Sequence, residues 1–255
     1  MSKFQPATTI DEVLEQLDII ITDSINNKNR AGYFAALYRR VTATVKAKIA
    51  EEYFDDNPRM ERLDVVFANR YLEAHYAFTN NEACTKSWQL AFETCANWRP
   101  LVIQQLFVGM NAHISLDLGI AAAIVQPDDI GSLHNDFNKI NRILNELTDV
   151  VQDELSQIFW PLKIIDVLAG GVDEKIAGFA MGIARDAAWD VALAYSKLSP
   201  EEHDAYIVKR DLEVYQFGQK ILRPGPWITV VISVFRILEK GTVASKIRVL
   251  NEGNK

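Results

Sequence analysis

Hydrophobic residues recur along most of this chain at three- and four-residue intervals, the spacing of helices that bury one face. Capping residues, prolines and glycines separate the repeats, and Thr9-x-x-Glu12 is a capping box that begins the first helix. The predicted helices cover about 9–24, 30–54, 58–79, 82–96, 100–126, 129–160, 173–198 and a segment that begins at 200. The pattern predicts an all-α fold: one domain over 1–255, a bundle of about nine or ten helices, with loose tails at 1–8 and 243–255.

One segment near the carboxyl end is rich in β-branched residues and has the propensity of a strand. It reads WITVVISVFRIL and follows a turn that contains Pro224, Gly225 and Pro226. No other segment offers it a partner strand, so we expect a buried helix that ends near Gly241.

The most apolar stretch lies between Pro100 and Pro127 and contains only two ionisable side chains in 26 residues, His113 and Asp117. It is long enough to span a bilayer. However, several polar side chains interrupt it and no basic cluster flanks it, so we expect the central buried helix of the bundle and no membrane span.

His113 and Asp117 are four residues apart and therefore share one face of that helix. Gln104, Asn111 and Ser115 fall on the opposite face, which leaves the pair pointing inward if the milder face meets water or a neighbouring helix. A carboxylate is costly to bury without a partner. The pair is therefore either a self-satisfied core contact or the inner part of a site, as a metal ligand pair or a general-base dyad.

Other polar residues could complete such a site. Asp64 and His75 share a face of the predicted third helix, but about 16 Å separates them along it, so only one could join His113 and Asp117. His134 begins a stripe that either lines a polar cavity or is a solvated helix flank. The candidate metal ligands are His113, Asp117, His75, Asp64 and His134, and the candidate substrate-binding residues are Asn138, Asn141, Arg185 and Trp189.

Arg185 and Trp189 share a helix face, where a stacked pair could hold an anionic group or make an ordinary packing contact. The net charge of −7 argues against nucleic acid as the main partner. The amino-terminal residues have no secretory pattern, and Cys84 and Cys95 are too far apart on one helix for a disulfide, which together predict a cytoplasmic protein. Nucleotide-binding glycine loops and the ferritin-like, zinc-protease and serine-hydrolase motifs are absent.

The run Asn111-Ala-His-Ile-Ser-Leu-Asp-Leu118 resembles the Asn-Ala-His-Ile-x-x-Asp-Leu signature of a bacterial, all-helical family of unknown function. Phe67-Ala-x-Arg-Tyr71 and Arg185-Asp-x-x-Trp189 look similar to segments of the same family. The resemblance implies that His113 and Asp117 belong to a shared feature, and it supplies no activity.

A second, weaker resemblance is to the all-helical zinc phospholipase C and P1 nuclease group, whose members carry His-x-x-x-Asp on a helix. His113 and Asp117 match that motif, and Asp64 and His75 lie upstream. Asn138 stands where the group has a downstream acid, and four histidines are too few for three zinc ions. The resemblance therefore implies at most a reduced, one-metal site.

Three hypotheses follow. The first is a metal-dependent hydrolase in which zinc, or another divalent ion held by His113 and Asp117, activates a water for attack on a small-molecule substrate. The second is a non-catalytic helical protein that binds a small hydrophobic ligand. The third is a metal-free enzyme in which His113 and Asp117 act as the general base. The sequence does not specify the substrate or the oligomeric state.

Overall fold

The computed structural model describes residues 3–144, 147 and 173–252, with side chains described from 184 onward in the second part. Its elements are α1 (Ile10–Asn27), α2 (Gly32–Ala50), α3 (Asn57–Thr79), α4 (Lys86–Ala96), α5 (Val102–Ala112), a π-helical turn η1 (His113–Leu118), α6 (Gly119–Val125), a 3-10 turn η2 (Ile130–Leu133), α9 (Asp173–Tyr195), α10 (Pro200–Leu222), α11 (Pro226–Leu238) and α12 (Val243–Glu252). Residues 134–144 are also helical. No strand occurs among the described residues, which confirms the all-α prediction.

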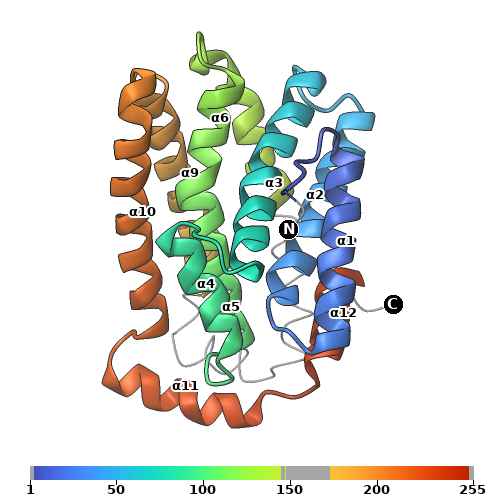
Figure 1. Cartoon of the computed structure of the whole chain (residues 1–255), viewed down its shortest axis with the longest axis vertical. Helices are drawn as coiled ribbons and strands as arrows, with labels where there is room; N and C mark the ends of the chain where they lie inside the picture. The colour runs from blue at the N-terminus through green and yellow to red at the C-terminus, as the bar shows by residue number, and fades with distance from the viewer. Residues whose placement is uncertain (1–2, 145–146, 148–172, 253–255) are drawn as a thin grey trace.

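The long helices run side by side as a bundle, and α11 lies crosswise at one end of it (Figure 1). The predicted helix over 129–160 is a 3-10 turn and then a helix over 134–144, and its part from 148 onward lies outside the described residues. Cys84 precedes α4 instead of lying on it, and both cysteines are free.

Local sequence explains how the first helices begin and end. Thr9 Oγ1 accepts a hydrogen bond from the Glu12 backbone N–H, and Glu12 accepts in turn from the Thr8 backbone, which is the predicted cap. α1 extends to Asn27, beyond the expected end near 24, and stops where Lys28 adopts a left-handed conformation. α3 begins directly after Asp56, whose side chain accepts a hydrogen bond from the Arg59 backbone N–H.

The central apolar segment is buried as predicted, but it is not one regular helix. α5 passes through the π-helical turn at His113–Leu118 into α6, and side chains such as Leu106, Leu116 and Ile120 are almost completely buried. The 24 residues Val102–Val125 are long and apolar enough to cross a membrane, but 72% of the apolar window is buried inside the protein. The segment is therefore the core helix of this bundle.

The milder polar face of this segment packs against a neighbouring helix, which is one of the two conditions under which His113 and Asp117 point inward. Gln104 donates to the Ile221 carbonyl at 3.0 Å and Asn111 donates to the Val214 carbonyl at 2.8 Å, both on α10. The opposite face meets α2 and α3. Further along, Gly119 allows close packing with α9, because a Cβ there would lie 2.4 Å from the Ala188 carbonyl oxygen.

Two expectations for the carboxyl end are wrong. The WITVVISVFRIL segment forms a helix, α11, but none of its residues is buried. It lies across the end of the bundle, so that only one side of it can meet other helices (Figure 1). The expected loose tail at 243–255 contains α12, which buries Ile247 and Leu250 completely against the core.

The segment ahead of α1 is irregular, as expected for residues 3–8, but it is attached to the bundle. The Asn69 side chain accepts from the Ala7 N–H and donates to the Ala7 carbonyl, both at 2.8 Å. Phe4 also lies against Tyr76, with 5.8 Å between the ring centroids.

Candidate functional site

His113 and Asp117 lie in the π-helical turn, both facing the core. Their exposed fractions are 3% and 1%. The His113 Nδ1 and Asp117 Oδ2 atoms are 3.6 Å apart, which is longer than a hydrogen bond. π-helical turns are rare in proteins. Where one interrupts an α-helix, it is frequently at a functional site. This turn carries the only two ionisable side chains of the central segment.

Two donors from other helices fix the Asp117 carboxylate. Arg70 of α3 donates from Nε to Oδ1 at 2.7 Å, and Trp88 of α4 donates from Nε1 to Oδ2 at 2.8 Å. Burial by itself raises the pKa of Asp117, but the Arg70 guanidinium, His113 and Trp88 together hold that pKa below its usual 3.8. The carboxylate is therefore ionised at neutral pH, with one oxygen beside each donor.

Aromatic rings enclose the His113 imidazole. The Phe67 ring stacks on it, with centroids 3.6 Å apart and planes within 9°, and the Tyr38 and Phe34 rings meet it edge-on at 4.5 and 5.6 Å. Neither ring nitrogen has a hydrogen-bond partner among the described residues. Burial lowers the pKa of His113 below 6.5, although Asp117 opposes this shift. The imidazole is therefore neutral at pH 7, and one of its nitrogens carries an unused lone pair.

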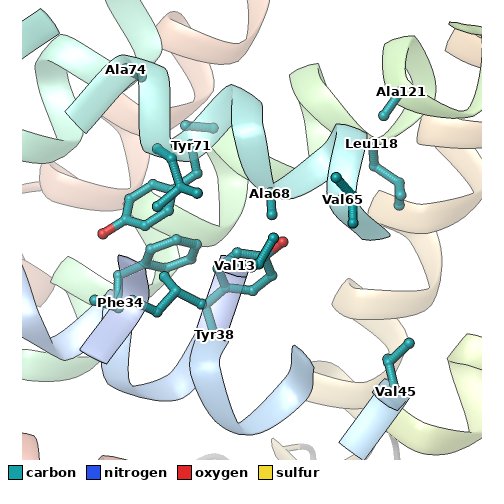
Figure 2. Close-up of a cluster of buried hydrophobic side chains, with 14 of the residues drawn as sticks. Val13, Phe34, Tyr38, Val45, Val65, Ala68, Tyr71, Ala74, Leu118 and Ala121 are labelled. Carbon is teal, nitrogen blue, oxygen red and sulfur yellow. The ribbon is translucent and has the colours of Figure 1, made fainter. Parts of the chain in front are cut away.

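Gly109 lies one turn before His113 on the same side of the central segment, where a residue without a side chain could leave space beside the imidazole. The Phe34 ring fills that space, because a Cβ at Gly109 would lie 2.8 Å from it. Figure 2 shows Phe34 and Tyr38 of α2 gathered with Tyr71 of α3 around Ala68, with Leu118 of the π-helical turn at one side. The enclosure around His113 is therefore aromatic on several sides.

Further buried polar atoms near this enclosure also have no hydrogen-bond partner among the described residues. They are the hydroxyls of Tyr38 and Tyr71 and Oδ2 of Asp64. Burial, and then the charges of Asp64 and Asp117, raise the pKa of Tyr38, which places both carboxyl groups within electrostatic reach of its hydroxyl. Burial also raises the pKa of Asp64 to about 7, with a smaller contribution from Glu61. Asp64 therefore takes up a proton at a much higher pH than an exposed aspartate does.

His75 is on α3 as predicted, and Tyr71 lies against both histidines. The Tyr71 ring is 6.1 Å from the His75 ring and 6.2 Å from the His113 ring. Phe92 covers another edge of His75, and burial lowers the pKa of His75 to about 4. His75 is therefore one aromatic ring away from His113, and its part in a site, like that of Asp64, stays a prediction.

The remaining predicted residues form a second cluster, between the 134–144 helix and α9. His134 Nε2 and Asn138 Nδ2 are 3.2 Å apart on an exposed face, and the Trp189 ring lies 4.6 Å from His134. Arg185 is buried and donates to the Asn141 side chain and to the Phe137 carbonyl.

Arg185 and Trp189 both pack against Phe137 of the 134–144 helix. The guanidinium lies over the Phe137 ring, 4.5 Å from its centroid, and the Trp189 ring lies against the same phenylalanine, with 5.0 Å between the ring centroids. Phe137 thus contacts both Arg185 and Trp189.

No group of three or more histidine, cysteine, aspartate or glutamate side chains that could hold a metal ion occurs among the described residues. The assignment of His113, Asp117, His75, Asp64 and His134 as metal ligands stays a prediction.

Arg70, Trp88 and Phe67 are the residues that sequence reasoning missed. Phe67 and Arg70 lie in a segment that was singled out only for its resemblance to a family, without a role. Trp88 gave no signal, because the contact that it makes with Asp117 joins residues 29 apart on two helices.

The fold and the site together define an all-helical protein with an arginine-anchored Asp–His pair buried in a π-helical turn. The chain belongs to the family described as "Family of unknown function (DUF5995)", whose model matches residues 10–224. The matched range contains the whole His113 centre and ends just before α11. No curated protein and no solved structure matches the chain.

Proposed function

We propose that this protein is a hydrolase in which His113 is the general base and Asp117 orients it. One observation carries the proposal: a neutral imidazole with two unused nitrogens lies beside a carboxylate whose position two other helices fix. A buried polar atom without a partner costs free energy, so stability alone does not explain this arrangement.

A small movement of the imidazole is enough to form the hydrogen bond between His113 and Asp117. If the imidazole approaches Asp117 by about half an ångström, Nδ1–H donates to Oδ2 within ordinary hydrogen-bond distance. Nε2 then presents its lone pair to a water molecule and removes a proton as the water oxygen bonds to the carbonyl carbon of the substrate. The imidazolium returns that proton to the leaving oxygen as the bond between this oxygen and the carbonyl carbon breaks. The adjacent carboxylate stabilises the imidazolium that forms, because it is already ionised.

The surroundings indicate the kind of substrate. The rings of Phe34, Phe67 and Tyr38 favour a small, largely apolar molecule. The Tyr71 hydroxyl, which has no partner among the described residues, offers a hydrogen-bond donor to a carbonyl or similar oxygen. A small carboxylic ester meets both requirements.

The metal-free form of the hypothesis fits this geometry better than the zinc form. Both Asp117 oxygens already accept hydrogen bonds, and one of the donors is a guanidinium 2.7 Å away. A cation at the same carboxylate would be repelled by Arg70 and would compete for these lone pairs. Zinc-dependent hydrolysis therefore stands second, and metal removal distinguishes the two forms.

The first experiment maps the access and basicity of His113 with diethyl pyrocarbonate, a small electrophile that acylates neutral imidazole. We expect slow modification of His113, measured by peptide mass spectrometry. The rate should rise with pH and reach its plateau at a pH below 6.5, because burial lowers the His113 pKa and the neutral imidazole is the reactive form. Exposed His134 shows in the same sample that the reagent is active. If His134 reacts completely while His113 in folded protein stays unmodified, the enclosure is sealed and the proposal fails.

The second experiment measures hydrolysis of p-nitrophenyl esters from acetate to octanoate, with and without EDTA. His113→Gln should lower kcat/KM by about 100-fold or more. His75→Gln is the matched control, because it removes another histidine of lowered pKa, half-buried on α3, and should leave the rate of a metal-free enzyme unchanged. Activity that EDTA abolishes would favour the zinc form, and binding of an ester without turnover would favour the non-catalytic ligand-binding protein.

A further inference from the structure

The outward side of α11 is apolar along the whole helix. The outward residues are Trp227, Val230, Val231, Val234, Ile237 and Leu238, here called the α11 face, and all are exposed, with Trp227 at 85% and Ile237 at 81%. At 100° per residue these six side chains fall within one half of the helical circumference. An exposed apolar surface of this kind marks an interaction site.

The three polar residues of α11 lie outside the α11 face, and two of them, Thr229 and Ser233, are also exposed. Arg236 is partly buried and donates to the Trp98 carbonyl and to Glu239, which binds this side of the helix to the bundle. Thr229 and Ser233 adjoin Arg236 on the helical wheel, and their hydroxyls donate to α11 backbone carbonyls. The helix therefore turns a continuous apolar side outward, whereas an ordinary surface helix turns its polar side outward.

Positive charge surrounds the α11 face, although the chain as a whole has a net charge of −7. Lys220, Arg223 and Lys240, from the ends of the neighbouring segments, are all exposed. Between 216 and 242 the sequence has one acidic residue, Glu239. Its side chain is buried and makes ion pairs with Arg236 at 2.6 Å and Lys246 at 2.8 Å. Among residues 216–242, the exposed charges beside the α11 face are thus basic.

The helix is too short to cross a bilayer. Its 13 residues extend about 20 Å, against about 30 Å of hydrocarbon. The axis bends by 66° between α10 and α11, and α11 lies flat across the end of the bundle (Figure 1). Trp98, also exposed, lies beside Arg236 at the same end. Tryptophan and exposed basic residues beside an apolar helix are typical of a helix that lies in the membrane interface.

We propose that α11 docks this end of the bundle onto a membrane surface that contains anionic lipids. The apolar side chains enter the boundary between headgroups and acyl chains, and Lys220, Arg223 and Lys240 contact the anionic headgroups. A second copy of the chain is a poorer occupant, because a symmetric contact through the α11 face would bring two sets of these cations together. The proposal does not depend on the activity proposed for His113.

The test is flotation of the full chain with vesicles of phosphatidylglycerol and phosphatidylcholine in equal amounts, or of phosphatidylcholine alone. We expect at least about tenfold more protein bound to the anionic vesicles, and a loss of that difference as NaCl is raised. Val231→Glu with Val234→Glu should abolish binding. Lys220→Gln, Arg223→Gln and Lys240→Gln together should remove the preference for anionic vesicles.

The matched control is Ile19→Glu with Val208→Glu, which places two charges at apolar positions of similar exposure, 68% and 70%, on α1 and α10. It should bind vesicles as the wild type does, and circular dichroism should show that every variant is folded. The proposal is overturned if the wild type floats with neither vesicle, or if the α11 variant binds as well as the control. It is also overturned if light scattering shows a dimer that the α11 variant dissociates.

Discussion

Two carboxylates in the core of this protein, Asp117 and Asp136, differ in what surrounds them. Asp136 accepts hydrogen bonds from two successive backbone N–H groups ahead of α3, at 2.7 and 3.1 Å, and pairs with Arg59 and Lys139. Asp117 also has two donors, but beside it lies His113, whose nitrogens have no partner among the described residues.

The difference separates a structural cluster from a candidate site. The groups around Asp136 hold the beginning of α3 against the 134–144 helix, and the Asp136 oxygens are used by the fold itself. The His113 enclosure keeps several polar atoms without partners, including Asp64 Oδ2. Polar atoms without partners do not stabilise the folded chain, but they can form hydrogen bonds with a bound water or substrate.

The largest effect should come from Asp136→Ala. It removes the acceptor of two backbone N–H groups and leaves the buried Arg59 guanidinium without this carboxylate. We expect a loss of about 3–5 kcal/mol in the free energy of unfolding, measured by urea denaturation. A loss below about 1 kcal/mol would show that the Asp136 cluster does not have the structural role assigned to it.

Arg70→Gln should have the next largest effect, about 2 kcal/mol, because it leaves the Asp117 carboxylate buried without its cation. The pH dependence should also change sign. In the wild type the Asp117 pKa is below 3.8, so its contribution to stability is present above pH 3.8 and is lost as the pH falls through the folded-state pKa. Without Arg70, burial raises that pKa, so stability should decrease as the pH rises above 3.8. Denaturation at several pH values measures the change, and an unchanged pH profile would contradict it.

Asp64→Asn should stabilise the protein at pH 8. Burial raises the Asp64 pKa to about 7. The contribution of Asp64 to stability is therefore fully present below pH 3.8 and is lost as the pH rises through about 7. A neutral amide does not have this cost, and we expect a gain of about 2 kcal/mol at pH 8 and none at pH 3. If Asp64 binds substrate, the same variant should also lower kcat/KM. A loss of stability at pH 8 would contradict the assigned desolvation.

The smallest effect should come from Asn138→Ala, in the exposed pair with His134. We expect a change within about 0.5 kcal/mol in the free energy of unfolding and no change in the reaction of His113 with diethyl pyrocarbonate. An effect on His113 would connect the cluster on α9 to the proposed active centre and would require its role to be assigned again.

The sequence could predict those features that depend on local periodicity. The all-helical fold, the capping box at Thr9 and the buried central segment follow from spacing within single helices. The inward face of His113 and Asp117 could be read from the helical wheel, because Gln104 and Asn111 mark the side that meets α10.

Features that depend on pairs of helices could not be predicted in this way. The contacts of Asp117 with Arg70 and Trp88 join three helices, and no pattern along the chain encodes which helices meet. The exposure of α11 was missed for the same reason: an apolar sequence gives the affinity of a helix for apolar surroundings, but not whether the bundle supplies them.

The π-helical turn at His113–Leu118 also sets the rotational phase of everything that follows it in the central segment. Such a turn holds one residue more than an α-helical turn, which rotates the later residues by about 100° relative to an uninterrupted helix. Gly119, immediately after the turn, depends on that phase to face the Ala188 carbonyl. Conversion of the turn to a regular α-helix with no residue removed would therefore rotate Gly119 away from the Ala188 carbonyl and turn another side chain towards α9. The extra residue thus couples the geometry of the candidate site to the packing of α6 on α9.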